Sequence, residues 1–338
     1  MMRAWQLEDF GMANLRRVDR PTPTPGSGEL LVRVAAAALN YRDKVVVAGK
    51  LLPERMPRPL VPVSDASGRV AAVGPGVTRF GIGDRVATHV FSRWLDGEAG
   101  PNEMDHCFGG PLDGGLAEFM IVPEDAAVAV PPSLTDAEAA TLTTAALTAW
   151  FALVERGGLR AGETVLTQGT GGVSLFAVQF AAAIGARVIA TSSSDAKLER
   201  ARALGATDLI NYRATPDWDR VALDLTEGQG VDHVIELAGG PSLNRSITAT
   251  RVGGQVAVIG FLDRPTAEVN LVPLLFRQTR IQGIAVGHRR AFERMNRFIE
   301  EHRIRPVIDS TYPFEDAPAA FDHLDRGPFG KVVINVGG

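Results

Sequence analysis

Between residues 164 and 302, short apolar segments with strand character alternate with segments of helical composition. The strand-like segments are residues 164–168, 187–191, 208–210, 232–237, 255–260 and 280–286. One helical segment ends near residue 184, and three others cover residues 195–204, 242–250 and 290–302. Apolar strands separated by helices are typical of a parallel sheet with helices on both faces. The pattern predicts an α/β fold with a doubly wound parallel sheet.

A glycine-rich turn joins the first of these strands to its helix, in the sequence LTQGTGGVSLFAVQ of residues 166–179. Gly169 and Gly171 occupy the first two glycine positions of a G-x-G-x-x-G turn, and Ser174 occupies the third. Such a match alone can be an ordinary turn, but here it lies directly between a strand and a helix, as a dinucleotide site requires. We therefore predict that a pyrophosphate binds at Gly169, Thr170, Gly171, Gly172 and Val173.

The residues after the second strand indicate which dinucleotide is bound. NAD-binding turns carry an acidic residue about 20 residues beyond the glycines, which binds the ribose 2′-hydroxyl. In this chain the position is Ser192, followed by Ser193 and, in the next helix, by Lys197. Hydroxyl groups and a cation suit a 2′-phosphate, so we predict NADPH as the cofactor. Ser194 has a simpler role as the N-cap of the helix that starts at Asp195.

The first 125 residues have a different sequence pattern, in which short β-type segments alternate with Gly- and Pro-rich turns. The segments are residues 29–39, 68–74, 83–90 and 116–122. They predict a partly open β-barrel. Residues 134–153 are helical in composition, with Asp136 as the expected N-cap and Gly157-Gly158 as the end. The tail after residue 304 returns to β-type segments around a short helix, which suggests that it rejoins the first domain.

Composition excludes several classes of protein. The net charge is −4 and no run of Lys or Arg occurs, so nothing indicates nucleic-acid binding. The single cysteine, Cys107, allows no internal disulfide and no multi-cysteine zinc site. The N-terminus lacks a signal-peptide pattern, and the most apolar long segment, residues 173–190, is interrupted by Gln179, Gly185 and Arg187. We expect a cytoplasmic protein that does not bind membranes.

Several motifs in this order resemble the medium-chain dehydrogenase/reductase superfamily. They are GRVAAVGPGVTRFGIGDRV at residues 68–86, QGTGGVS at 168–174 and LGATDLINY at 204–212. The resemblance implies a GroES-like partly open β-barrel domain formed by residues 1–127 and 304–338, and a Rossmann NADP-binding domain formed by residues 128–303. It also implies an active site in the cleft between them.

Zinc-dependent members of this superfamily carry a catalytic cysteine and a GHE motif, and this chain departs from both. Asn40 stands at the position of the cysteine, and Ser64 and Asp65 stand at the histidine and glutamate positions. Asp65 together with His89, His106 or Cys107 offers an alternative ligand set, but its spacing matches no known zinc pattern. We therefore predict no metal site. Residues 91–115 are expected to form an irregular loop and a possible lid.

The sequence Asn40-Tyr41-Arg42-Asp43 resembles a segment of the zinc-free branch, which includes quinone and enoyl reductases. By this resemblance, Asn40 contacts the nicotinamide ribose, and Tyr41 binds the substrate carbonyl or supplies a proton. Two alternatives stay open for Tyr41: a packing role, and solvent as the proton source. Arg42 and Asp43 are expected to pair with each other or to face solvent.

Further cofactor contacts are expected from the resemblance and from the carboxyl ends of successive strands, where open α/β sheets bind ligands. The predicted residues are Thr144, Thr148, Tyr212, Leu237, Ala238, Gly260, Phe261, Ala285, Val286 and Lys331. His288 is expected to be an exposed loop histidine, with a position in the cleft as the alternative.

These observations predict a zinc-independent, NADPH-dependent oxidoreductase that transfers hydride to an activated C=C bond or a quinone. The alternatives are an NAD(P)-dependent alcohol or aldehyde dehydrogenase, and a catalytically silent NADPH-binding protein. The expected partner is a small-molecule substrate. The resemblance further implies a homodimer joined through residues 280–286.

Overall fold

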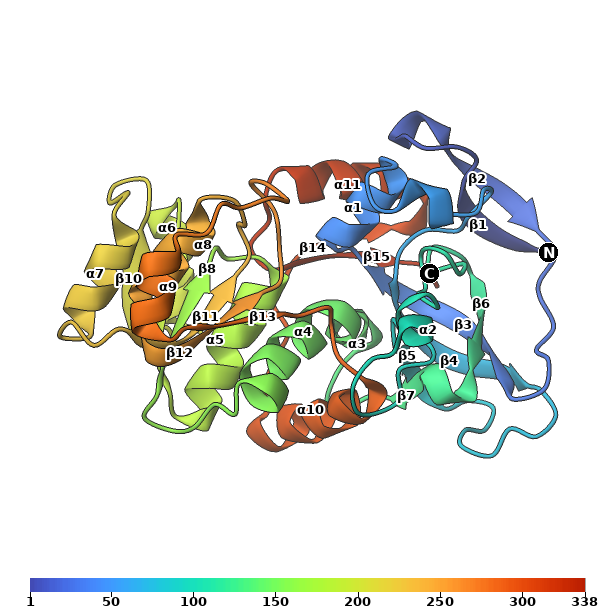
Figure 1. Ribbon diagram of the computed structural model, residues 1–338. Helices are drawn as coiled ribbons and strands as arrows, with labels where there is room; N and C mark the ends of the chain where they lie inside the picture. The colour runs from blue at the N-terminus through green and yellow to red at the C-terminus, as the bar shows by residue number, and fades with distance from the viewer. Residues whose placement is uncertain (338) are drawn as a thin grey trace. The chain divides into compact units, whose positions relative to one another are not determined.

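The computed structural model describes residues 1–337, and the chain divides into two compact units (Figure 1). Unit 1 consists of Met1–Leu147 and Gly287–Gly338, and unit 2 of Thr148–Val286. The prediction placed the boundaries at residues 127/128 and 303/304. The difference arises because α3 (Asp136–Ala140) packs on β3 and β4, and α10 (Arg289–His302) packs on β7. Both helices therefore belong to unit 1.

Unit 1 contains a seven-stranded sheet with the order β14-β15-β3-β4-β5-β7, and β6 pairs with β3. The strands are β3 (Glu29–Ala38), β4 (Asp65–Val73), β5 (Arg85–Thr88), β6 (Phe119–Pro123), β7 (Ala127–Ala129), β14 (Ile308–Pro313) and β15 (Lys331–Asn335). β15 pairs antiparallel with β3, so the C-terminal segment returns to the first domain as expected. Gly68 is required at the pairing of β3 and β4, because a Cβ there would lie 2.0 Å from the Arg33 carbonyl oxygen.

A second, two-stranded sheet in unit 1 consists of β1 (Met2–Leu7) and β2 (Leu15–Arg20), which the sequence analysis did not identify. Ala4 and Leu7 are fully buried in the main core of the unit, and Trp5 packs against that core. The helices of unit 1 besides α3 and α10 are α1 (Tyr41–Val47), α2 (Pro101–Met104) and α11 (Ala317–Asp325). The short 3-10 helices are η1 (Met12–Asn14), η2 (Pro53–Arg55), η3 (Glu124–Ala126) and η6 (Phe314–Asp316).

The predicted helix over residues 134–153 is a chain of shorter helices. α3 is followed by η4 (Leu142–Ala146), α4 (Leu147–Trp150) and η5 (Phe151–Arg156), of which η4 and η5 are π-helical. The N-cap is Thr135 and not Asp136, because the Thr135 hydroxyl accepts from the Glu138 amide and the Glu138 carboxylate accepts from the Thr135 amide. The series ends at Gly157, followed by Gly158 at φ +63°.

Unit 2 contains a six-stranded sheet that is parallel throughout, with the order β10-β9-β8-β11-β12-β13. The strands are β8 (Thr164–Gln168), β9 (Arg187–Ser192), β10 (Asp208–Asn211), β11 (Val231–Glu236), β12 (Thr250–Val258) and β13 (Arg280–Gly283). The chain moves outward from β8 to β10 and then returns to β11, which creates a switch point between β8 and β11. The predicted doubly wound fold is confirmed.

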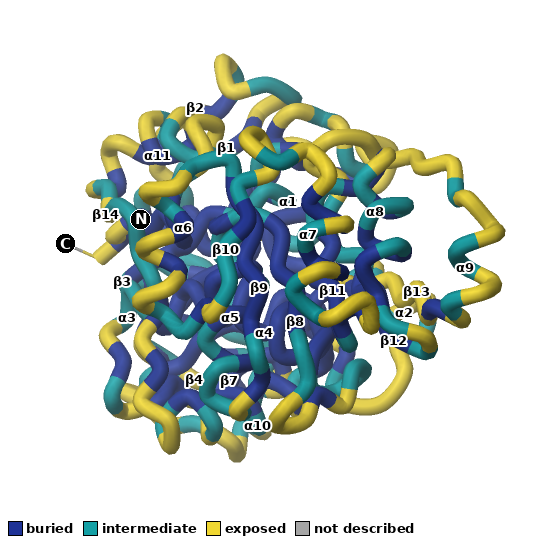
Figure 2. Tube along the Cα trace, turned by 90° about the vertical axis from the view of Figure 1, so that its left-hand side faces the viewer, coloured by how far each residue is buried: buried dark blue, intermediate teal, exposed yellow. Residues whose placement is uncertain are grey.

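The helices of unit 2 include two that the sequence analysis did not identify. Besides the π-helix η5, the helices of this unit are α4, α5 (Gly172–Ile184), α6 (Asp195–Arg202), α7 (Trp218–Leu225), α8 (Ser242–Ala249) and α9 (Leu271–Arg277). Neither α7 nor α9 was predicted. Figure 2 shows β8 and β9 in the dark blue of buried residues, whereas α9 is yellow and teal. Within residues 1–337, no helix is both long and apolar enough to cross a membrane.

Candidate functional site

The glycine turn of unit 2 leaves its backbone accessible. Gly169 adopts φ +74°, and Gly171 is the N-cap of the 13-residue helix α5. A Cβ built on either glycine meets no heavy atom within 4 Å, so the space above the turn can receive a bound group. Ser174 is fully buried and its hydroxyl donates to the Gln168 carbonyl (2.6 Å), which explains why serine replaces the third glycine. The turn fits a pyrophosphate at a helix N-terminus.

The predicted 2′-phosphate residues lie at the carboxyl ends of β9 and β10. Ser192 is buried and ends β9, and its carbonyl accepts from the amide of Tyr212, which follows β10 (3.0 Å). Ser194 is the N-cap of α6, as expected, and accepts from the Lys197 amide. Asp195 also lies nearby, but its carboxylate accepts from the Asn211 side-chain amide (2.7 Å). Ser192, Ser193 and Tyr212 therefore lie at the same edge of the sheet, and Lys197 lies in the first turn of α6.

The remaining predicted contacts of unit 2 follow β11, β12 and β13. A cavity of about 460 Å³ lies at the ends of these strands, and Gly260, Phe261 and Ala285 line it. Leu262 donates its amide to the Leu237 carbonyl (3.2 Å), which ties the loops after β11 and β12 together. Val286 adopts φ +64°, a conformation that is unfavourable for a β-branched residue. Thr148 is buried on α4.

Two buried polar side chains of unit 2 were missed by the sequence analysis. Gln168 ends β8 and Glu236 ends the neighbouring strand β11, and their side chains bond at 2.7 Å. The Gln168 side-chain oxygen accepts from the amides of Leu237 (3.1 Å) and Ala238 (3.2 Å). The signal was present in the sequence, because both TVLTQ and VDHVIE end an apolar strand with a polar residue.

In unit 1, Asn40 and Asp43 form a buried network with Ser64. The Asp43 carboxylate accepts hydrogen bonds from the backbone amides of Asn40 (2.8 Å) and Ser64 (3.0 Å) and from the Ser64 hydroxyl (3.2 Å). Burial, and then the charge of Asp65, raises the pKa of the Asp43 carboxyl above its usual value. The expectation that Asp43 faces solvent or pairs with Arg42 is wrong, because Asp43 is fully buried and holds the start of α1 against the residue before β4.

Lys331 is the cation of this network. Its ammonium donates to the Asn40 side-chain oxygen (2.6 Å) and the Leu39 carbonyl (2.7 Å), and it lies 3.7 Å from the Asp65 carboxylate. Lys331 and Asp65 are 3% and 0% exposed. Burial lowers the pKa of Lys331, and the two aspartates oppose this shift. The Thr144 hydroxyl donates to Asp65 (2.5 Å). The polar groups of Lys331 and Thr144, both predicted to contact the cofactor, thus have partners inside unit 1.

Tyr41 and Arg42 begin helix α1. Tyr41 is half-buried, and the Lys44 ammonium lies 5.9 Å from the centre of its ring. Arg42 donates to the carbonyls of Phe108 (3.2 Å) and Gly110 (2.6 Å), which corrects the expectation that it faces solvent or pairs with Asp43. Phe108 is buried, so this part of the loop over residues 91–115 is fixed to the core of unit 1.

The residues considered as zinc ligands in the sequence analysis do not fit the metal. Asn40 and Asp65 already hold the Lys331 ammonium, which would repel a second cation, and the Ser64 hydroxyl donates to the carboxylates of Asp43 and Asp65. His89 is buried and bonds the Gly287 carbonyl (2.8 Å) through Nε2. Burial raises the pKa of the Cys107 thiol to about 11, which disfavours a thiolate ligand. Among residues 1–337, no three His, Cys, Asp or Glu side chains form a group able to hold a metal ion.

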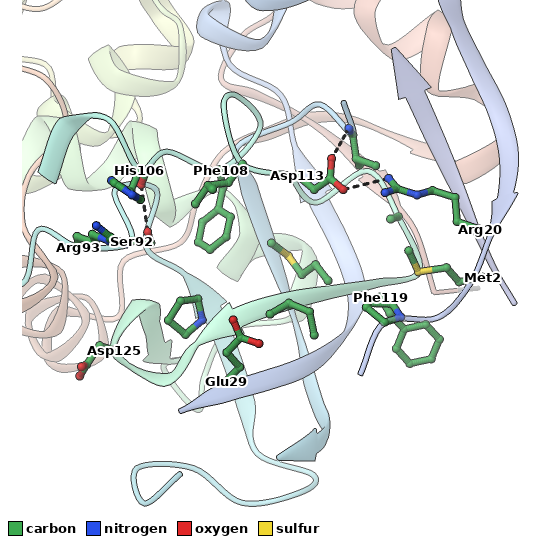
Figure 3. Close-up of a pocket in the computed structure, with 18 of the residues that line it drawn as sticks. Met2, Arg20, Glu29, Ser92, Arg93, His106, Phe108, Asp113, Phe119 and Asp125 are labelled. Atoms are coloured by element: carbon green, nitrogen blue, oxygen red, sulfur yellow. Dashed lines mark hydrogen bonds and ion pairs between the residues drawn. The ribbon is translucent and has the colours of Figure 1, made fainter. Parts of the chain in front are cut away.

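Two further features of unit 1 lie apart from these networks. A cavity of about 670 Å³ is lined by Arg20 and Asp113, which form an ion pair (3.0 Å), and by Ser92 and His106 (Figure 3). None of the predicted site residues lines this cavity. His288, expected to be exposed, is instead buried and caps α10, because its Nδ1 accepts from the Ala291 amide (2.9 Å).

Comparisons with known proteins agree with the fold. Residues 26–132 match the alcohol dehydrogenase GroES-like domain, and residues 172–301 match the zinc-binding dehydrogenase family. A zinc-type alcohol dehydrogenase-like protein of Schizosaccharomyces pombe is 40% identical over 316 residues, which cover 91% of each chain. The quinone oxidoreductase of Rattus norvegicus is 29% identical, and the match covers 99% of this chain and 98% of the rat enzyme.

Solved structures resemble the whole chain. The crystal structure of a Sinorhizobium meliloti 1021 protein, provisionally named an alcohol dehydrogenase, is 46% identical with a TM-score of 0.93, and the match covers 99% of this chain and 98% of that one. A structure named an NAD-dependent alcohol dehydrogenase is 35% identical with a TM-score of 0.90, over 99% and 100% of the two chains. With a GroES-like unit, a parallel dinucleotide-binding sheet and these relatives, the chain belongs to the medium-chain dehydrogenase/reductase superfamily of oxidoreductases.

Proposed function

We propose that this chain is a zinc-independent, NADPH-dependent reductase of an activated C=C bond or a quinone. The observation that carries the proposal is the position of the Lys331 ammonium between Asn40 and Asp65. Asn40 stands at the position of the catalytic cysteine of the zinc enzymes, and Asp65 stands at the glutamate position of their GHE motif. Without a metal to polarise an alcohol oxygen, the chemistry that fits best is hydride addition to a carbon that is already electrophilic.

NADPH oxidation tests this proposal directly. The purified protein should oxidise NADPH in the presence of an enone, an enal or a quinone, and chelators should leave the rate unchanged. Metal analysis should find less than a stoichiometric amount of zinc. A rate on simple alcohols that chelators abolish would instead establish the second candidate, an alcohol dehydrogenase, which the names of several relatives favour.

The preference for NADPH rests on Ser192, Ser193 and Lys197, with Tyr212 at the same edge of the sheet. Ser192→Asp places a carboxylate where the 2′-phosphate would bind, so NADPH should bind at least tenfold more weakly while NADH binding is kept or improved. Ser310→Asp, at a half-buried position on β14 of unit 1, is the control for the added charge. Tighter binding of NADH than of NADPH by the wild type would contradict the assignment.

For the substrate, we propose that Asn40 orients the nicotinamide ribose and that Tyr41 binds the substrate oxygen or delivers the proton. The amide of Asn40 has a fixed orientation, because its side-chain oxygen accepts from Lys331 and its nitrogen lies 3.3 Å from the Ser64 hydroxyl. Tyr41→Phe should lower kcat by roughly a hundredfold if the phenol delivers the proton. Full turnover by this variant would identify water as the proton source.

The proposed assembly is a homodimer that pairs through β13. This strand is the edge of the parallel sheet, and all four of its residues are exposed. An unpaired edge strand with apolar neighbours is a surface that a second copy can extend.

A further inference from the structure

Glu236 is a fully buried carboxylate at the carboxyl end of β11. One carboxylate oxygen accepts from the amides of Ala238 and Gly239, both at 3.0 Å. The other accepts from the Gln168 side-chain amide (2.7 Å) and from the hydroxyls of Ser242 (3.2 Å) and Ser246. Each of these five partners can donate a hydrogen bond, so the arrangement suits an ionised carboxylate.

The carboxylate of Glu236 is held by neutral hydrogen-bond donors. A carboxylate that accepts several hydrogen bonds is stabilised in its ionised form even when it is buried. All five donors are uncharged groups, so they stabilise the negative charge without cancelling it. A buried charge also acts over a longer distance than an exposed one, because the surrounding protein screens it less than water does.

The carboxylate lies at the part of the sheet that suits the nicotinamide half of the cofactor. In a sheet with this strand order, the glycine turn after the first strand and the ribose-binding position after the second place the adenosine half over β8, β9 and β10. The nicotinamide half then falls to β11, β12 and β13. Glu236 lines the 460 Å³ cavity at the ends of these three strands, together with Gly260 and Ala285.

We infer that Glu236 sets the redox bias of the bound cofactor, an inference that rests on the proposed function. Hydride donation breaks a C–H bond of the neutral dihydronicotinamide ring, forms a C–H bond on the substrate carbon and leaves a cationic pyridinium ring. The substrate anion takes its proton from Tyr41 or water. A buried anion beside the cavity stabilises the cationic ring relative to the neutral one and so favours hydride donation. Through its bonds to Ala238 and Gly239, Glu236 also fixes the loop after β11.

The test is the ratio of the dissociation constants for NADP⁺ and NADPH, measured by calorimetry and by NADPH fluorescence with no substrate present. Glu236→Gln removes the charge and keeps the size, so the NADP⁺/NADPH ratio should rise roughly tenfold. Glu236→Asp keeps the charge, so both affinities can fall but the ratio should stay near that of the wild type. Gln168→Lys places an ammonium beside Glu236 and should shift the ratio as Glu236→Gln does, which provides a second route if the first variant fails to fold.

Asp232→Asn is the matched control, since Asp232 lies on the same strand about 13 Å away, towards the opposite end of the sheet, where it accepts from the Thr164 amide. This variant should leave the ratio unchanged. Equal weakening of both cofactors by Glu236→Gln would reduce the role of Glu236 to loop structure and overturn the inference. Failure of the proposed function has a different signature: the wild type would then prefer the NAD⁺/NADH pair, with which the same ratio can be measured.

Discussion

At the scale of single residues, the most consequential side chain of unit 1 is Lys331, because it is the cation beside two buried carboxylates. Lys331→Met should lower the free energy of unfolding by about 3–5 kcal/mol, since Asp65 and Asn40 lose their buried partner. Urea denaturation followed by tryptophan fluorescence measures the loss.

The double variant Lys331→Met/Asp65→Asn separates charge from packing. Removing the uncompensated carboxylate should recover part of the stability that Lys331→Met loses, so the two effects should not add. Additive losses would mean that the charges of Lys331 and Asp65 do not interact, and that Lys331→Met acts through the lost hydrogen bonds to Asn40 and the Leu39 carbonyl.

The sequence predicted the unusual residues of this network and left their contacts unknown. The departure from the zinc pattern at Asn40, Ser64 and Asp65 could be identified because each position was compared with a motif. The contacts of the Lys331 ammonium inside unit 1 could not be predicted, because 291 residues of chain separate it from Asn40 and the pairing of β15 with β3 brings them together. Gln168 and Glu236 were missed for the same reason: their bond joins two strands 68 residues apart.

At the scale of elements, the link between β5 and α10 should make stability depend on pH. His89 follows β5, and burial lowers its pKa from 6.5 to about 4, with the neutral ring bonded to the Gly287 carbonyl just before α10. Between these values the unfolded chain binds a proton that the folded chain does not. The neutral His89 ring therefore contributes fully to the free energy of unfolding above pH 6.5. This contribution falls as the pH decreases towards 4, by about 3 kcal/mol in total.

His89→Gln keeps a nitrogen donor but cannot titrate, so its unfolding free energy should fall less steeply than that of the wild type between pH 6.5 and 4. His302→Gln, on the exposed end of α10, is the control and should keep the slope of the wild type. Parallel curves for His89→Gln and the wild type would show that His89 does not carry this pH dependence.

Helix α3 offers a smaller effect at the same scale. Thr135→Ala removes the hydroxyl that accepts from the Glu138 amide and should cost about 1 kcal/mol of stability by thermal or urea denaturation. Asp136 is the residue that the sequence analysis expected to be the N-cap. Asp136→Ala is a poorer test of capping, because it also removes a hydrogen bond from the Arg85 guanidinium (2.9 Å). Thr135→Ser, which keeps the hydroxyl, should stay close to the wild type, and a loss as large as that of the alanine variant would contradict the capping role.

The elements that sequence patterns predicted are those whose periodicity reflects burial. The strands β8, β9, β11 and β12 are apolar because neighbouring strands and helices cover them, and all four were identified. Helix α9 carries Leu271, Leu275 and Phe276 on its exposed surface, so its composition gives no inward-facing stripe. The β1–β2 hairpin was missed because its strands mix polar and apolar residues without a regular alternation.

At the scale of the whole molecule, the edge of unit 2 has the character of an interface. Leu275 and Phe276 of α9 are 70% and 80% exposed, and the exposed Ile281 lies on β13. Figure 2 shows this region in the colours of exposed and intermediate residues. Monomeric proteins rarely expose so much clustered apolar surface beside an unpaired strand, because the edge would be prone to aggregation.

If a second copy covers this surface, the protein should sediment as a dimer of about 72 kDa, twice the 36.0 kDa of the chain. Phe276→Asp should convert it to a monomer at micromolar concentration, because the carboxylate would be buried without a partner at the centre of the contact. Ile82→Asp is the matched control, since Ile82 is 71% exposed in unit 1 and carries no predicted contact. A wild type that sediments as a monomer, or a control variant that dissociates to the same extent, would remove the assignment of this edge as the dimer interface.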